Sequence, residues 1–74
     1  MSKCIFYIGC GESQKLAVQS LVDSGYLVYG SGTTEPTFAD GLLAGFYRID
    51  AQDEESLLDV CKILAAEHEI AFVY

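Results

Sequence analysis

Apolar and polar residues follow two different periods along this chain of 74 residues. Short apolar runs bounded by turn formers predict strands over residues 4–8, 27–29, 42–49 and 71–74. Two other segments repeat apolar residues at helical spacing, and they predict helices over residues 14–24 and 54–67. The pattern therefore predicts the element order strand, helix, strand, strand, helix, strand.

Local signals place the ends of both predicted helices. Ser13 is a plausible N-cap for the first helix, and Glu12 adds negative charge at the positive end of that helix. Gly25 follows the first helix at a position where helices commonly end in a left-handed turn. Asp53 is the expected N-cap of the second helix, and two glutamates fall in its first turn.

Short elements in this order favour one compact domain, residues 1–74, with a two-layer α+β sandwich fold. The expected sheet is antiparallel, with strand order 4-1-3-2 and both helices on one face. Residues 30–41 are rich in turn formers and include the single proline, which predicts a long loop between the second and third strands. The sequence assigns no role to this loop.

Three segments carry a resemblance to known small domains. They are the glycine-containing turn before the first helix, the helix-to-strand step LVDSGYLV, and the segment DEESLLDVCKIL before the last strand. Over nearly its whole length the chain resembles the ferredoxin-like βαββαβ superfold and, more loosely, ACT-type regulatory domains. The ACT-type resemblance implies a bound small molecule near residues Gly9, Cys10, Gly11, Glu12 and Ser13, or at a subunit boundary.

The predicted strands are apolar on both faces, although helices on one side of a sheet would bury only one face. Four tyrosines fall in the alternating set expected to face away from the helices: Tyr7, Tyr29, Tyr47 and Tyr74. An exposed aromatic patch of this kind is typical of an interface. The pattern therefore predicts a protein partner or a homodimer on the open sheet face. The alternative is that the domain tolerates this aromatic face in contact with water, or that long side chains cover it.

Eleven acidic residues against four basic residues give the chain a net charge of −7. This charge disfavours direct binding to nucleic acid and favours a partner with a basic surface, although it can also serve solubility alone. The acidic residues expected to meet such a partner are Asp50, Asp53, Glu54, Glu55 and Asp59. No apolar run approaches the roughly 20 residues of a membrane span, and no signal-peptide pattern is present, so a cytoplasmic protein is expected.

Patterns for catalysis and metal binding are weak. The three cysteines form no CxxC pair and His68 is the only histidine, so neither a metal site nor a cofactor is predicted. Cys10, in the turn after the first strand, is the single candidate for an exposed thiol. The Gly9-x-Gly11 turn lacks the third glycine of a dinucleotide-binding fingerprint. We therefore expect no catalytic residue and no enzymatic activity.

Two functional hypotheses follow from these patterns. The first is a small acidic, non-enzymatic interaction protein, an inhibitor or adaptor that acts by occluding a protein partner. In size, charge and lack of catalytic patterns it is similar to inhibitors encoded by phages and mobile elements, including anti-CRISPR proteins. The second is an ACT-like regulatory module that binds a small molecule. The sequence names neither the partner nor the ligand.

Overall fold

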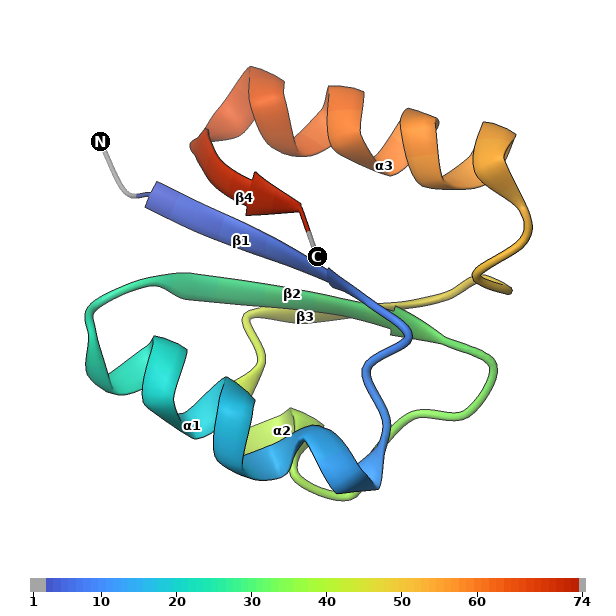
Figure 1. Cartoon of the computed structure of the whole chain (residues 1–74). Coiled ribbons are helices and arrows are strands. Elements are labelled where there is room, and N and C mark those ends of the chain that lie inside the picture. Colours follow the sequence, from blue (N-terminus) through green and yellow to red (C-terminus); the bar gives the residue numbers. More distant parts are fainter. Residues whose placement is uncertain (1–2, 74) are drawn as a thin grey trace.

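The computed structural model describes residues 3–73, and its sheet is parallel throughout (Figure 1). The strands are β1 (Lys3–Ile8), β2 (Leu27–Gly32), β3 (Gly45–Arg48) and β4 (Glu69–Val73). The helices are η1 (Glu12–Gln14), a short 3₁₀ helix, followed by α1 (Lys15–Asp23), α2 (Ala39–Leu42) and α3 (Glu54–Glu67). The strand order across the sheet is β3-β2-β1-β4.

This topology corrects the fold that the sequence pattern predicted. The antiparallel order 4-1-3-2 is wrong, and so is the placement of both long helices on one face. Neighbouring parallel strands need a crossover connection of about a dozen residues, because a tight hairpin can join only antiparallel strands. Residues 33–44, predicted as mostly loop, provide that crossover between β2 and β3. The ferredoxin-like sandwich is therefore not the fold of this chain.

The short helix α2 is the element that the sequence prediction missed. Phe38 and Leu42 lie four residues apart, as do Ala39 and Leu43, which is helical spacing. Phe38 and Ala39 are buried. Leu42 and Leu43 are partly buried and pack against the apolar cluster that contains Phe38. The strand predicted over residues 42–49 consequently begins only at Gly45.

Helices cover both faces of the sheet, with α3 on one side and α1 and α2 on the other (Figure 1). The cluster under α3 contains Cys4, Phe6, Leu57, Val60 and Leu64. The cluster under α1 and α2 contains Cys10, Val18, Val28 and Phe38. Strands buried on both faces are apolar on both faces, as is usual in parallel sheets. The two-sided apolar pattern therefore results from burial within the domain.

The tyrosines do not share one open sheet face. Tyr29 and Tyr47 pack against the cluster under α3, and the ring of Tyr47 meets Phe6 edge-on at a centroid distance of 6.3 Å. Tyr7 packs on the opposite face, where its hydroxyl donates a hydrogen bond of 2.7 Å to Oε1 of Gln14. Tyr74 lies outside the described residues. The expected aromatic face is therefore corrected to two separate, helix-covered environments.

The helix ends follow local signals in two of the three predicted cases. The carboxylate of Asp53 caps α3, accepting hydrogen bonds from the Ser56 backbone N–H (3.2 Å) and hydroxyl (2.8 Å). Gly25 has a φ of +95° just after α1, the left-handed turn expected there. Ser13 lies inside η1, and α1 begins only at Lys15 without a side-chain cap. Of the helices between residues 3 and 73, none combines the length and apolarity needed to cross a bilayer.

Candidate ligand site at the carboxyl ends of the strands

The strand order creates a topological switch point between β1 and β4. From β1 the chain passes through α1 to reach β2, whereas β4 is reached from β3 through α3 on the opposite face. In open α/β sheets, ligands bind in the crevice outside the carboxyl ends of the strands at such a point. Two hollows lie at this end of the sheet in the present chain.

The first of them, the apolar hollow, has a volume of about 250 Å³. It is lined by Ile8, Glu54, Leu57, Leu58, Cys61 and Val73. Ile8 and Val73 are the last residues of β1 and β4, and the other four come from the first eight residues of α3. Leu58 is 60% exposed and Val73 is 50% exposed. Apolar side chains left in water around a concave surface are suited to contact the apolar part of a ligand.

The second, the backbone hollow, has a volume of about 200 Å³ and is lined by Gly9, Cys10, Gly11, Gly32, Thr33 and Thr34. The first three residues follow β1, and the other three are the last residue of β2 and the two residues after it. The Cys10 N–H joins the two segments by donating a hydrogen bond of 2.7 Å to the Ser31 carbonyl. Glycines leave their peptide groups accessible, and threonine hydroxyls can donate or accept hydrogen bonds. The backbone hollow therefore suits the polar part of a ligand.

The two hollows lie at the same end of β1. Ile8 lines the apolar hollow and Gly9, the next residue, lines the backbone hollow. Gly9 has a φ of +73°, a conformation that residues with a β-carbon rarely adopt. Its turn directs the chain from the sheet toward η1 and α1, on the face opposite α3. Consecutive residues at the end of β1 therefore line the two hollows.

Glu12 connects the β1–α1 segment to the β2–α2 segment. Its Oε1 accepts a hydrogen bond from the Thr37 backbone N–H, and its Oε2 accepts one of 3.0 Å from the Thr37 hydroxyl. These hydrogen bonds hold the pKa of Glu12 below its usual value, and the charge of Lys15 lowers it further. The carboxylate is therefore ionised and engaged next to the backbone hollow, where its charge opposes the binding of phosphate groups.

The thiol of Cys10 is not exposed, contrary to expectation. The residue is 1% exposed, and burial raises the pKa of its thiol. Burial, with a smaller contribution from Cys61, also raises the pKa of Cys4. A raised pKa disfavours the reactive thiolate. Cys10 therefore forms a wall of the backbone hollow and is poorly suited to act as a nucleophile.

The structure brings together only part of the ligand set predicted from the sequence. Gly9, Cys10 and Gly11 line the backbone hollow, but Glu12 is engaged by Thr37, and Ser13 is an exposed residue of η1 outside both hollows. The segment 32–34 and the α3 wall were missed. Residues 32–34 lie at the carboxyl end of β2, but that position indicates a site only once β2 is known to run parallel to β1.

The predicted acidic set lies around the start of α3, and its members are exposed. Asp53 caps the helix, and the carboxylate of Asp50 accepts a hydrogen bond of 2.8 Å from the Gln52 backbone N–H. Glu54 also lines the apolar hollow. The remaining two, Glu55 and Asp59, make no ion pair or side-chain hydrogen bond within residues 3–73. Part of this acidic set therefore has a structural role.

Comparison with known proteins identifies no relative. No protein-family model, no curated protein and no solved structure matches this chain. Among residues 3–73, no group of three or more His, Cys, Asp or Glu side chains is arranged to hold a metal ion. The functional interpretation therefore depends on the geometry of the chain itself.

Proposed function

We propose that this chain is a small-molecule-binding α/β domain whose site lies at the carboxyl ends of β1, β2 and β4. The supporting observation is that the consecutive residues Ile8 and Gly9 line an apolar hollow and a backbone-lined hollow at the carboxyl edge of a parallel sheet with a switch point beside β1. Parallel α/β sheets bind their ligands at this position. This proposal retains the small-molecule hypothesis from the sequence, without the ACT-like fold.

The size and charge of the site narrow the ligand class. The two hollows, about 250 Å³ and 200 Å³, together suit a single small metabolite rather than a dinucleotide. The apolar or aromatic part of the ligand contacts Leu57, Leu58 and Val73, and its polar part bonds to peptide groups and threonine hydroxyls. The net charge of −7 and the ionised Glu12 favour a neutral or singly charged polar group over a polyphosphate.

A thermal-shift panel of amino acids, nucleosides and small aromatic acids tests this proposal. A ligand that binds only the folded state at 100 times its Kd stabilises it by about 2.7 kcal/mol, which raises Tm by about 10 °C or more in a domain this small. We expect Leu58→Asp to weaken the binding of a hit by about tenfold, because it places a carboxylate beside the apolar part of the ligand. Gly11→Leu should also weaken binding by filling the backbone hollow, since nothing lies within 4 Å of a β-carbon there.

Matched control variants separate binding from folding. Leu16→Asp alters an α1 leucine that is 84% exposed and lines neither hollow. Gly41→Leu alters a glycine of α2 that is equally free of neighbours within 4 Å. Both controls should keep the affinity of the wild-type chain. If no compound raises Tm, or if the hits bind the Leu58 and Gly11 variants as tightly as the wild type, the proposed site is wrong.

The acidic start of α3 supports a second candidate function. Glu54, Glu55 and Asp59 are exposed, and none of them forms an ion pair within residues 3–73. We infer that this surface suits a basic protein partner, in keeping with the inhibitor or adaptor hypothesis from the sequence. The aromatic part of that hypothesis is not retained, because Tyr7 and Tyr29 lie on opposite faces of the sheet.

Charge reversal tests the acidic surface. A pull-down followed by mass spectrometry supplies a partner, and its affinity is then compared for the wild type and for Glu54→Lys with Glu55→Lys. We expect weaker binding with a reduced salt dependence, because two attractive charges become repulsive. Asp53 is left unchanged, since loss of an N-cap costs about 1 kcal/mol of helix stability. The matched control reverses Asp23 and Glu69, and equal binding by both double variants would contradict the role of the α3 surface.

A further inference from the structure

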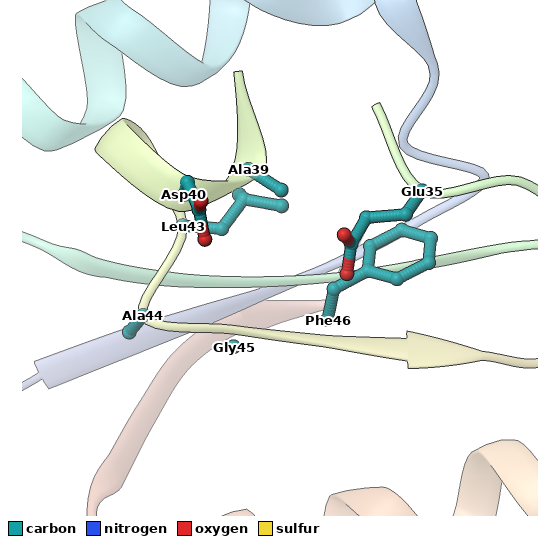
Figure 2. A pocket seen from close by; sticks show the side chains of 7 residues that line it. All are labelled: Glu35, Ala39, Asp40, Leu43, Ala44, Gly45 and Phe46. Carbon is teal, nitrogen blue, oxygen red and sulfur yellow. The ribbon is translucent and has the colours of Figure 1, made fainter. Parts of the chain in front are cut away.

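A third cavity lies away from the switch point, between α2 and the amino end of β3 (Figure 2). Its volume is about 240 Å³. Glu35 contributes from the β2–α2 connection, Asp40 from α2, and Phe46 from β3. The remaining wall consists of small or aliphatic residues from α2 to the start of β3. None of these residues belongs to the proposed ligand site at the carboxyl ends of the strands.

Two uncompensated carboxylates line this cavity. Figure 2 shows the Glu35 side chain extending beside the ring of Phe46, with the Asp40 carboxylate on the α2 side. Within residues 3–73 neither carboxylate forms an ion pair or accepts a hydrogen bond. None of the four basic residues of the chain lines the cavity. Two unpaired negative charges around one concave surface raise the local concentration of cations.

The ring of Phe46 adds a second and independent attraction for a cation. The negative face of an aromatic ring attracts ammonium and guanidinium groups within about 6 Å of the ring centroid. A hard metal ion such as Ca²⁺ instead takes about six to eight oxygen ligands. The cavity therefore suits an organic cation better than a metal ion. The two carboxylates can contact its charged group, and the ring and aliphatic side chains can contact its hydrocarbon part.

We propose that this cavity binds an alkylammonium or guanidinium group. The charged group lies between the carboxylates of Glu35 and Asp40, and its alkyl chain contacts Phe46 and the aliphatic wall. A free amine and a lysine or arginine side chain of a peptide present the same chemistry, so the experiment distinguishes these two sources. The proposal is independent of the proposed site at the switch point, because the two share no residue.

An NMR titration of the full chain with n-butylammonium chloride tests the proposal. We expect saturable shifts of the backbone amide signals of Ala44, Gly45 and Phe46, and no such shifts with 1-butanol, which has a similar shape but no charge. Glu35→Gln and Asp40→Asn should each weaken binding by about tenfold, because each removes one of the two charges. Phe46→Leu should weaken it several-fold through loss of the ring, and raising the salt concentration should weaken it further.

The control and the second probe complete the test. Glu69→Gln removes one exposed charge on β4, at the opposite edge of the sheet from β3, and should leave the affinity unchanged. Glu35 and Asp40 are exposed, so their variants should give the dispersed spectrum of a folded chain. Tighter binding of acetyl-Gly-Lys-Gly-amide than of butylammonium identifies a peptide as the source, and the reverse order identifies a free amine. Equal binding of butanol, no saturable shift, or full affinity in the two carboxylate variants would overturn the proposal.

Discussion

Phe6→Asp and Val28→Asp should each unfold the domain, although the two side chains point to opposite faces of the sheet. Phe6 packs under α3 and Val28 packs under α1 and α2, and both are 0% exposed. Each change removes a buried apolar side chain, at about 2–5 kcal/mol, and adds an unpaired carboxylate in an apolar environment. A domain of this size has a free energy of unfolding of about 4–11 kcal/mol. Circular dichroism measures the loss of secondary structure, and urea denaturation measures the loss of stability.

This pair of variants tests the arrangement of the layers. If helices covered only one face of the observed sheet, one of the two aspartates would lie on the open face and be tolerated. In the observed arrangement both faces are covered, so both variants lose their structure. Leu16→Asp is the control, because this α1 leucine is 84% exposed and an aspartate there remains in water. Wild-type stability of either core variant would disprove the two-sided burial.

Gly30→Ala should destabilise the domain by about 1–3 kcal/mol, because its β-carbon overfills a packed position. Gly30 is buried in β2, and a β-carbon there would lie 3.0 Å from Cβ of Cys10 and 3.1 Å from Cδ1 of Leu43. The sign of the change in the free energy of unfolding shows whether this position is closely packed. Where the backbone and the surroundings tolerate it, replacing glycine by alanine usually stabilises a protein by about 0.4–1 kcal/mol, by restricting the unfolded chain.

Gly11→Ala is the matched control for this effect. Gly11 has a φ of −113°, and nothing lies within 4 Å of a β-carbon at this position. Its substitution should therefore leave stability unchanged or raise it slightly. The midpoints of urea denaturation of both variants, compared with the wild type, measure the two effects. A Gly30→Ala variant as stable as Gly11→Ala would show that β2 does not pack closely against Cys10 and Leu43.

The candidate site was predictable in part. The ACT-type resemblance implied Gly9, Cys10 and Gly11, and the glycine turn on which this resemblance partly depends is visible in a single stretch of sequence. The other wall of the backbone hollow comes from residues 32–34, and the apolar hollow combines Ile8 with Leu58 and Val73. These segments are distant in sequence and meet only because parallel strands bring their carboxyl ends to one edge of the sheet.

Local features were determined by the sequence alone. The bounds of α3, its Asp53 cap and the left-handed turn at Gly25 depend on residues within about one helical turn of each other, so they can be recognised without knowledge of the fold. The first strand was also located to within one residue, because its apolar run is bounded by a charged residue and a glycine.

Strand direction and order were decided only by the tertiary structure. An apolar strand has the same sequence pattern whether its neighbour runs parallel or antiparallel, and an apolar second face can be buried by a helix or by another protein. Here the crossover through α2 made β3 parallel to β2, and α3 carried the chain to the other face before β4. Tyr7, Tyr29 and Tyr47, which the sequence pattern assigned to one open face, therefore pack against clusters on opposite faces of the sheet, because packing between distant segments determines which apolar residues meet.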